Sequence, residues 1–353
     1  MEQEHKRRVR YKGTHPRSYQ EKYKELNPEK YQADVAKIVQ SGKTPAGTHI
    51  PIMVEEILEF LQIQPGQTGY DATLGYGGHT RRMLAALQGQ GHLYATDVDP
   101  IESEKTRKRL ADLGYGPDIL TIRRMNFAQA DQVAPGVKFD FVLADLGVSS
   151  MQIDNPERGF TFKFDGPLDL RLDPSAGVPA AQRLRELDME ELTALLVENA
   201  DEPYAEAIAK AVMKVFKSGG TIETTKQLAA VIGGALSFLP QPERKEAVKK
   251  SCQRTFQALR IDVNSEFEVL YACLDKLPGI LKPGGRAAIL TFHSGEDRLV
   301  KKAFKQHLRE GVYSEISEDV TRPSAEECFR NPRARSTKLR WAIRADREKE
   351  ETI

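Results

Sequence analysis

Two hydrophobic periodicities alternate along residues 48–145 of the chain. Segments with apolar residues three and four positions apart are separated by short runs that are apolar almost throughout. The first pattern predicts amphipathic helices and the second predicts buried strands. The predicted helices lie at 53–62, 78–87 and 101–113, and the predicted strands lie at 69–73, 92–97, 119–123 and 139–145. Because the two kinds of element alternate, we expect βαβ units and a parallel sheet.

Beyond residue 145 the pattern changes. Residues 146–175 have few periodic signals, which indicates a long loop, and long loops inside a compact domain are often functional. Residues 180–250 have helical periodicity alone, and Thr224 and Thr225 are placed to cap one of these helices. A helix, a turn and a buried strand follow at 262–280, 281–285 and 286–293. We therefore expect an α/β domain that is interrupted by a helical insertion and then resumes.

This organisation divides the chain into four segments. A polar N-terminal extension at 1–47 precedes the first part of the α/β domain at 48–150. A loop and helical insertion at 151–253, expected to recognise the substrate, precedes the second part at 254–353, which ends in a basic segment. No apolar run approaches the roughly 18 residues of a membrane span, and the first residues lack the apolar core of a signal peptide. We expect a cytoplasmic protein without a membrane partner.

The composition narrows the function only slightly. The 353-residue chain is 40% hydrophobic and carries a net charge of +1, which neither requires nor excludes a nucleic-acid partner. Basic residues crowd both ends of the chain, where they suit phosphate contacts or form solvated tails. Cys252, Cys273 and Cys328 lack the spacing of a zinc site or a disulfide framework. We therefore expect reduced thiols and no metal site.

The stretch DATLGYGGHT at 71–80 follows the first predicted strand. Its glycines, Gly75, Gly77 and Gly78, indicate a backbone that turns sharply or lies close to a ligand. The Lys-Ser/Thr pair of a phosphate-binding P-loop is missing, and Thr80 leaves the dinucleotide fingerprint GxGxxG incomplete. Asp97, about 20 residues further on at a strand end, is placed to accept hydrogen bonds from ribose hydroxyls, with Asp99 as its competitor. At this point NAD and S-adenosylmethionine remain equal candidates.

Polar side chains also follow the strand at 139–145. Asp145 ends this strand, and the hydroxyls of Ser149 and Ser150 and the amide of Gln152 come soon after it. Open α/β sheets bind ligands at the carboxyl ends of their strands, so we expect these groups to line one crevice with the glycine loop.

Several long blocks of the sequence resemble the bacterial family that methylates N4 of a cytidine in the decoding region of 16S rRNA (RsmH, also called MraW). The resemblance covers roughly residue 48 to the C-terminus, in family order. The blocks are HIPIMVEEIL at 49–58, DATLGYGGHT at 71–80, DVDP at 97–100, DLGVSSMQIDNPERGFTFKFDGPLDLRLD at 145–173, RTFQALRIDVNSE at 254–266, LKPGGRAAILTFHSGEDRLVK at 281–301 and NPRARSTKLR at 331–340.

This resemblance implies a Rossmann-like class I S-adenosylmethionine-dependent methyltransferase with an inserted helical domain. It implies S-adenosyl-L-methionine as the cofactor and 16S rRNA in the small ribosomal subunit as the partner, with a homodimer left open. Carried over by position, and together with Gly75 of the same loop, the cofactor-binding residues are Gly77, Gly78, His79, Asp97, Phe127, Asp145 and Gln152.

The expected chemistry is direct transfer to an exocyclic amine. Methylation of cytosine C5 usually needs a cysteine nucleophile, and none of the three cysteines lies in a recognisable nucleophile motif. We expect Asp145, with Ser149 or Ser150, to lie near the amine, where an acceptor localises the nitrogen lone pair and positioning supplies much of the rate. Other candidates are Asp165, Asp169 and His293, with a salt bridge to Arg171 as the alternative role for Asp169 and a structural hydrogen bond for His293.

Six arginines in the family-like blocks are expected to contact RNA phosphates or bases, because the guanidinium fork can bind two oxygens. They are Arg158, Arg171, Arg254, Arg260, Arg333 and Arg335. For Arg333 and Arg335 a turn that stabilises the fold is the alternative. A cytidine inside folded RNA must be splayed out to reach the cofactor.

The chain departs from the family pattern in three places. It carries the N-terminal extension, it has Asp71-Ala72 where Gly commonly precedes the Thr of the loop, and Gly295 replaces the leucine of the usual FHSLEDR. These departures keep open a paralogue that methylates a different RNA cytidine or a small molecule. A nicotinamide oxidoreductase and a non-catalytic ribosome-assembly factor are the remaining alternatives.

Overall fold

The computed structural model of the chain describes residues 51–346, apart from the side chain of Ser150. The predicted N-terminal extension lies outside the described residues. Within 51–346, none of the helices combines the length and hydrophobicity that a membrane crossing requires.

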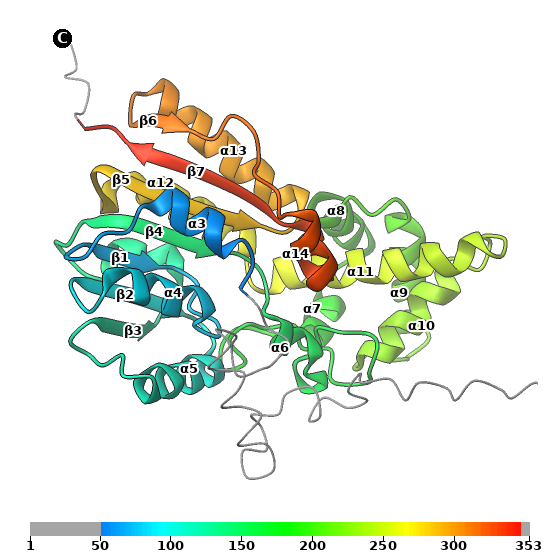
Figure 1. Cartoon of the computed structure of the whole chain (residues 1–353). Helices are drawn as coiled ribbons and strands as arrows, with labels where there is room; N and C mark the ends of the chain where they lie inside the picture. Colours follow the sequence, from blue (N-terminus) through cyan, green and yellow to red (C-terminus); the bar gives the residue numbers. More distant parts are fainter. Residues whose placement is uncertain (1–50, 347–353) are drawn as a thin grey trace, which may run out of the picture. The chain divides into compact units, whose positions relative to one another are not determined.

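A seven-stranded sheet forms the frame of the α/β part (Figure 1), in the order β3-β2-β1-β4-β5-β7-β6. The first five strands pair in parallel, whereas β7 pairs antiparallel with both β5 and β6. The strands are β1 (Thr68–Asp71), β2 (His92–Asp97), β3 (Leu120–Arg124), β4 (Phe139–Asp145), β5 (Leu281–Thr291), β6 (Tyr313–Ile316) and β7 (Lys338–Arg344). This architecture confirms the predicted Rossmann-like α/β fold.

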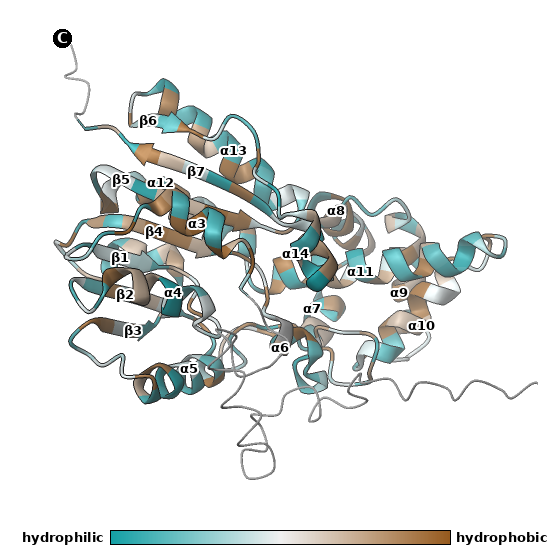
Figure 2. Cartoon of the chain, in the orientation of Figure 1, coloured by the Kyte–Doolittle hydropathy of each residue, from teal (hydrophilic) through white to brown (hydrophobic). Residues whose placement is uncertain are grey.

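Apolar cores cover both faces of this sheet. On β4, Val142 and Ala144 belong to one core, which includes residues of α12 and α13, and Phe141 and Leu143 belong to the other, which includes residues of α3, α4 and α5. A strand buried on both faces has no polar side to show, which is why FDFVLAD reads as a continuous apolar run. The helices are α3 (Val54–Leu61), α4 (Gly78–Leu87), α5 (Pro100–Asp112), α12 (Glu266–Ile280) and α13 (Ser294–Arg309). In Figure 2 β4 and β5 are mostly hydrophobic, while α3 and α13 show mixed surfaces.

Five further helices share a separate apolar core. Leu184, Leu196, Ile208, Leu228 and Leu259 are among its fully buried side chains. The helices are α7 (Ala180–Glu186), α8 (Met189–Ala200), α9 (Ala205–Lys217), α10 (Thr225–Ala235) and α11 (Glu243–Val263). They form the predicted helical insertion. The Thr224 hydroxyl accepts a hydrogen bond from Gln227 N and caps α10, as predicted, and Thr225 is the first residue of that helix.

The structure differs from the expected boundaries where α11 ends. The domain boundary expected at 253/254 lies inside this continuous 21-residue helix, whose Phe256 and Leu259 pack in the insertion core. The helix expected at 262–280 is two helices, because the chain breaks between α11 and α12 at Ser265, whose φ is 48°. The insertion therefore extends to Val263.

Smaller differences concern the turn at 281–285 and the loop at 146–175. The turn residues belong to β5 as an irregularity, where the pairing jumps from Phe139–Leu281 to Phe141–Arg286 and Gly284 takes a φ of 71°. The loop contains two short helices, α6 (Ser150–Asp154) and η3 (Pro156–Arg158). Within the described residues, six further elements were not predicted. They are η2 (Phe127–Gln132) between β3 and β4, the helix α13 after β5, and, near the end of the chain, β6, α14 (Ala325–Arg330), η4 (Pro332–Ser336) and β7.

Candidate active site

Three parallel strands end in aspartate at the same edge of the sheet. Asp71 ends β1, Asp97 ends β2 and Asp145 ends β4. The strands lie side by side in the sheet, so the three carboxylates come together although 26 and 48 residues separate them along the chain. This edge is the one at which open α/β sheets bind ligands.

The glycine loop connects β1 to the first turn of α4. Gly75 N donates to Asp97 Oδ2 at 2.8 Å, and the Thr106 hydroxyl donates to Gly75 O at 2.6 Å. Gly77 has a φ of 72°, and a Cβ there would lie 2.8 Å from Thr106 Cγ2, so this position requires glycine. A Cβ on Gly75 would meet nothing closer than Thr73 O at 3.8 Å, which leaves open space beside the loop.

The N-terminus of α4 can receive a ligand. The helix begins at Gly78 and His79, and no side chain caps its N-terminus. The unpaired N–H groups of a helix N-terminus favour negatively charged groups. Loop and helix together thus offer backbone donors next to open space.

Asp71, a departure from the family pattern, has a structural role. Its side chain is buried, Oδ2 accepts from the Thr80 hydroxyl at 2.6 Å, and Oδ1 accepts from Thr73 N at 3.1 Å. Burial raises the pKa of this carboxyl above its usual value. Thr73 Oγ1 in turn accepts from Asp145 N at 2.6 Å, so Asp71 helps to hold the chain ends on either side of the crevice.

Asp97 and Asp99 were both candidates for the residue that binds the ribose hydroxyls, and they differ in their hydrogen bonds. Asp97 Oδ1 accepts from Asp99 N and Oδ2 from Gly75 N, so each oxygen keeps a second lone pair for a ligand. Burial raises the pKa of Asp97 to about 6. Asp99 is wholly buried and caps α5 through Ile101 N and Glu102 N. Asp97 is therefore the better candidate for ribose.

Asp99 also explains two residues that we expected at the ligand. Its Oδ2 accepts from Arg158 Nη1 at 2.6 Å and from Gln152 Nε2 at 2.9 Å. Arg158 further donates to the carbonyl oxygens of Arg171 and Leu172. Because Arg158 is buried in this ion pair, the expectation that it contacts RNA is corrected: it is a structural cation. The Gln152 side chain also accepts from Ser149 N at 2.8 Å and so completes the capping box of α6.

His79 and Asp145 face each other across the crevice wall. His79 Nε2 lies 3.4 Å from Asp145 Oδ2. Both His79 Nε2 and Asp145 Oδ1 are buried atoms without a hydrogen-bond partner. His79 Nε2 has at least the nearby Asp145 Oδ2 as an ion-pair partner, whereas Asp145 Oδ1 has none. Buried polar atoms in native proteins are almost always paired, so this oxygen at a strand end indicates a place for a ligand.

The remaining crevice candidates lie around this pair. Ser149 caps α6, its Oγ accepting from Gln152 N, which leaves its O–H free to donate. Ser150 is the first residue of α6, and its side chain lies outside the described structure. Phe127 opens η2 after β3 and is half-buried against the core that includes residues of α12. The structure thus leaves Ser149 and Phe127 accessible to a ligand.

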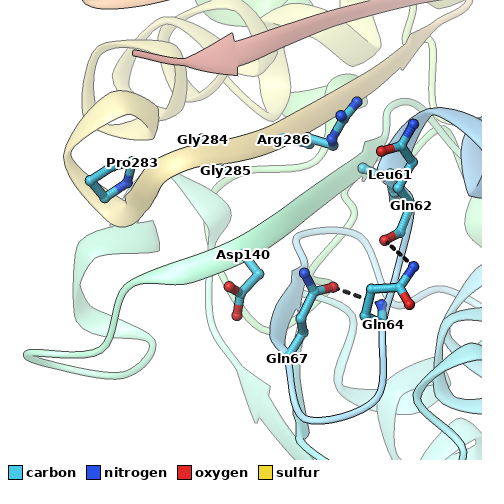
Figure 3. A pocket seen from close by; sticks show the side chains of 9 residues that line it. All are labelled: Leu61, Gln62, Gln64, Gln67, Asp140, Pro283, Gly284, Gly285 and Arg286. Atoms are coloured by element: carbon cyan, nitrogen blue, oxygen red, sulfur yellow. Dashed lines mark hydrogen bonds between the residues drawn. The ribbon is translucent and has the colours of Figure 1, made fainter. Parts of the chain in front are cut away.

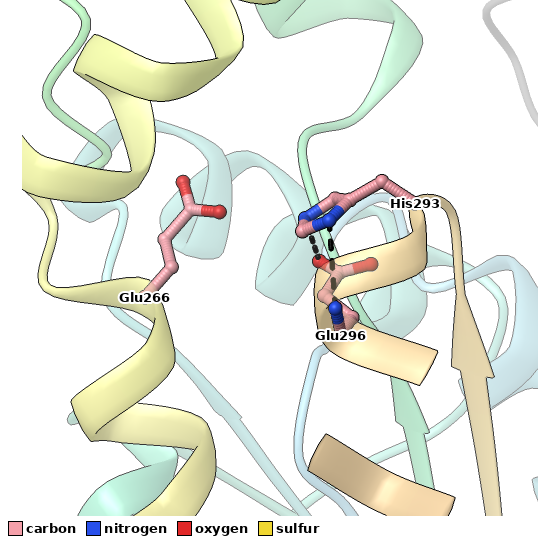
Figure 4. A group of neighbouring side chains, drawn as sticks. All are labelled: Glu266, His293 and Glu296. Atoms are coloured by element: carbon pink, nitrogen blue, oxygen red, sulfur yellow. Dashed lines mark hydrogen bonds and ion pairs between the residues drawn. The ribbon is translucent and has the colours of Figure 1, made fainter. Parts of the chain in front are cut away.

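His293 belongs to a charged network at the end of β5 (Figure 4). Its Nε2 lies 3.2 Å from Glu296 Oε1, and Nδ1 accepts from Glu296 N at 3.4 Å. On the facing helix α12, Glu266 accepts two hydrogen bonds from Arg260, at 2.7 and 2.9 Å. Burial alone would raise the pKa of Glu296, but His293, Phe292 N and Arg260 outweigh it and lower that pKa.

This network corrects the expectation for Arg260 and bears on metal binding. Arg260 is engaged with Glu266 rather than placed for RNA. Glu266, His293 and Glu296 each offer a ligand atom within 4.8 Å of the others. However, Arg260 occupies both oxygens of Glu266, and a guanidinium there repels a cation. We therefore interpret the cluster as an ion-pair network that joins α11, α12 and α13.

The other arginines that were predicted to contact RNA differ in their ion pairs and in their exposure to solvent. Arg171 is bound to Asp169 through two hydrogen bonds, at 2.8 and 2.7 Å, which is the salt bridge weighed as the alternative for Asp169. Arg333 pairs with Asp154 at 2.8 Å, and its side chain is 37% exposed. Arg254 is partly exposed on α11, and Arg335 is exposed. Asp165 is exposed and accepts from Lys226 N. Of the six arginines, Arg254, Arg333 and Arg335 are the ones that solvent reaches with most freedom.

A cavity of about 310 Å³ lies at the opposite end of the sheet (Figure 3). Its lining includes Gln64, Gln67, Asp140, Gly285 and Arg286. Asp140 accepts from Thr68 N and from Lys282, and Arg286 donates to Phe60 O. These groups lie at the amino ends of β1 and β4 or beside the β5 irregularity, away from the three aspartates, so we place the active site elsewhere.

The buried ion pair between Arg158 and Asp99 predicts a large effect on stability. Breaking a buried pair leaves an uncompensated charge and costs about 3–5 kcal/mol. We expect Arg158→Ala to lower the free energy of unfolding by about 3 kcal/mol, because Gln152 still donates to Asp99. Arg82→Ala is the matched control, since its ion pair with Glu55 is at the surface and is worth about 0–1 kcal/mol. Equal losses in urea titrations of the two variants would contradict the structural role.

Gly295 and Phe267 predict a compensating pair of substitutions. A Cβ on Gly295 would lie 2.6 Å from Phe267 Cζ, so the aromatic ring takes the space that a side chain at 295 needs. Gly295→Leu should lower the free energy of unfolding by about 1–3 kcal/mol through overpacking. Adding Phe267→Leu should recover part of this loss in a double-mutant cycle. Strictly additive effects in thermal unfolding would refute the coupling.

Comparison with known proteins agrees with this geometry. A sequence profile of the MraW methylase family matches residues 46–345. The ribosomal RNA small subunit methyltransferase H 1 of Agathobacter rectalis is 64% identical over 98% of this chain and 99% of its own length. The methyltransferase H 2 of Alkaliphilus metalliredigens is 62% identical over 98% and 99%, and the methyltransferase H of Thioalkalivibrio sulfidiphilus is 38% identical over 86% and 99%. The chain belongs to the MraW methylase family.

Proposed function

We propose that this protein transfers a methyl group from S-adenosyl-L-methionine to N4 of a cytidine in the decoding region of 16S rRNA. The observation that carries the proposal is the carboxylate of Asp145 at the carboxyl edge of the sheet, because its Oδ2 faces His79 Nε2 at 3.4 Å while its Oδ1 has no partner. Family membership and the names of the relatives, which act on small-subunit ribosomal RNA, support the substrate.

The cofactor fits the groups around the glycine loop. Asp97, with a spare lone pair on each oxygen, accepts hydrogen bonds from the ribose hydroxyls. The open space beside Gly75 and the uncapped turn at Gly78 and His79 receive the methionine part, whose carboxylate suits a helix N-terminus. Phe127 would pack on the adenine face. When bound, S-adenosylmethionine supplies an electrophilic methyl group on its sulfonium.

Asp145 acts on the amine of the target cytidine. Asp145 Oδ1 accepts a hydrogen bond from N4–H, which localises the nitrogen lone pair and aligns it for in-line attack. The bound cofactor would give its methyl group to N4 and leave as S-adenosylhomocysteine, and Asp145 would take the proton that N4 loses. His79, 3.4 Å from Oδ2, orients the carboxylate. Ser149 is a second acceptor near the amine.

The cysteines do not support the alternative chemistry at C5. Burial raises the pKa of Cys252 to about 11 and that of Cys273 to about 12, so neither forms the thiolate that attacks a pyrimidine ring. Cys328 is partly buried on α14, where it packs against the sheet core. Direct transfer to the exocyclic amine needs none of them.

The RNA partner is expected to contact the arginines that solvent reaches, Arg254, Arg333 and Arg335. The target cytidine must leave its stack to reach Asp145. Since the substrate is ribosomal RNA in the small subunit, we place the enzyme in the cytoplasm, with the ribosomes. The homodimer stays a prediction.

A second candidate is a paralogue that methylates a different RNA cytidine. One observation favours it: the relatives that are 55–65% identical carry the numbers H 1 or H 2 in their names, whereas those that are 37–38% identical carry none. The two candidates share the chemistry and differ only in the methylated position.

Methyl transfer from tritiated S-adenosylmethionine to unmodified small subunits tests the proposal. We expect N4-methylcytidine in the 16S rRNA, at one decoding-region position; a single mark elsewhere favours the paralogue, and no transfer to RNA refutes both. Asp145→Asn should lower kcat about 100-fold while cofactor affinity changes less than threefold. Asp275→Asn, an exposed carboxylate on α12, is the matched control.

The raised pKa of Asp97 predicts opposite pH effects on binding and on stability. Ribose hydroxyls bind the ionised carboxylate, so affinity for S-adenosylhomocysteine should fall about tenfold between pH 7.5 and pH 5, below the folded pKa of about 6. The folded pKa exceeds the ordinary value of 3.8, so the same group should add stability to the ligand-free protein as pH falls from about 7 to about 4.

Isothermal titration calorimetry and thermal unfolding measure the two effects. In Asp97→Asn the pH dependence of binding should disappear, although affinity at pH 7.5 is also reduced. If that variant retains the tenfold dependence, another group is responsible.

A further inference from the structure

The most exposed large hydrophobic side chain in the described structure belongs to Phe329, on α14. It is 85% exposed, and no residue of α14 is buried. An isolated exposed hydrophobic residue is ordinary on a protein surface. What distinguishes Phe329 is its position relative to the crevice and the charge around it.

A hydrogen bond of Glu327 holds α14 at the rim of the crevice, and the charge of the same residue interacts with His79. Glu327, two residues before Phe329, accepts from Met53 N at 2.8 Å, which ties α14 to the start of α3. Burial raises the pKa of Glu327, and His79 is near enough to act against that rise. His79 is the residue that faces Asp145, so α14 stands beside the candidate methyl-transfer site.

The segment that follows α14 reaches the other wall. Arg333, in η4, pairs with Asp154 of α6, the helix that begins just after Asp145. The next element, β7, begins opposite the carboxyl end of β5, where Lys338 pairs with Thr291. The buried Ala334 anchors η4 in the sheet core. The segment 325–336 therefore runs along the carboxyl edge of the sheet, between α3 and α6, with Phe329 on its exposed side.

The segment that carries Phe329 has charged residues of both signs, with Glu326, Glu327 and Arg330 on α14 itself. Arg330 is exposed and pairs with Glu326. Arg335 is exposed and makes no hydrogen bond or ion pair with the described residues. Arg322 is also exposed. An exposed aromatic ring on a segment that also carries exposed arginines suits single-stranded RNA, since the ring stacks on a base while a guanidinium group holds a phosphate.

We propose that Phe329 is a stacking platform for an unpaired RNA base beside the target cytidine, and that Arg335 holds a nearby phosphate. The proposal rests on the proposed function. A cytidine that leaves its stack also exposes the face of its neighbour, and an aromatic ring at the rim replaces the lost stacking partner. Phe329 is thus a substrate-binding residue outside the methyl-transfer site.

Binding of the full-length protein to unmodified small ribosomal subunits at several KCl concentrations tests this assignment. Phe329→Ala should weaken binding about tenfold without changing the slope of log K against log [KCl], because a stacking contact releases no counterion. Arg335→Ala should reduce that slope by about 0.7. Phe329→Trp should keep the affinity, whereas Phe329→Leu, which is apolar without an aromatic face, should bind as weakly as Phe329→Ala.

Kinetics give a second readout. Phe329→Ala should raise KM for small subunits about tenfold while KM for S-adenosylmethionine stays unchanged. Tyr271→Ala is the matched control, because it removes an aromatic side chain that is 67% exposed on α12, and it should leave every parameter unchanged.

Three results would overturn the proposal. They are unchanged affinity in Phe329→Ala, full affinity in Phe329→Leu, and a change of oligomeric state in Phe329→Ala without a change in RNA affinity, which would assign this face to a second copy of the chain. A wild-type protein that binds subunits but transfers no methyl group would refute the proposed function instead, and the affinity and salt slope would still decide the role of Phe329.

Discussion

The buried carboxylate of Asp99 is the interaction on which the site depends. It caps α5, accepts from Arg158 in η3 and accepts from Gln152 in α6. These contacts fix the segment after Asp145 to the edge of the sheet, while its apolar residues, among them Phe160 and Leu168, pack in the core of the insertion. Because a buried charge is stable only when it is paired, Asp99 leaves this segment little choice of position. The same segment leads into the helical insertion, so one ion pair connects the cofactor crevice to the insertion.

The three aspartates at the strand ends, which lie near this ion pair, differ in their hydrogen-bond partners. Asp71 is enclosed by Thr80 and Thr73 and supports the loop. Asp97 accepts only backbone hydrogen bonds and keeps lone pairs free, while Asp145 retains a buried oxygen without a partner. The three aspartates at equivalent strand ends thus differ in role, because the neighbouring loops donate different hydrogen bonds to their carboxylates.

The departures from the family pattern acquire physical meaning in the same way. Asp71 is not an irregularity of the glycine loop, because its carboxylate organises both ends of that loop. Gly295 leaves space that the ring of Phe267 fills, and this ring lies 5.8 Å from the imidazole of His293, measured between centroids. The substitution at 295 is therefore matched by a large side chain on the facing helix. The charged network of Arg260, Glu266, His293 and Glu296 lies directly beside this contact and joins the insertion to the sheet.

The sequence by itself determined the parallel sheet, the helical insertion, the glycine loop and the strand-end aspartates, because hydrophobic periodicity and strand order act locally and repeat regularly. It also led to the family through its long blocks. Only the tertiary structure decided which polar side chains are engaged in internal hydrogen bonds and ion pairs and which remain available to a ligand. Arg158, Gln152 and Arg260 have the residue types of a ligand or RNA site. The partner of Arg158 and Gln152 is Asp99, more than 50 positions earlier in the chain, whereas Arg260 pairs with Glu266 across the break between α11 and α12. The antiparallel pair β6 and β7 was missed for a related reason: its pairing with β5 brings together residues about 50 positions apart. Burial and partner choice depend on such distant contacts, and local sequence carries no record of them.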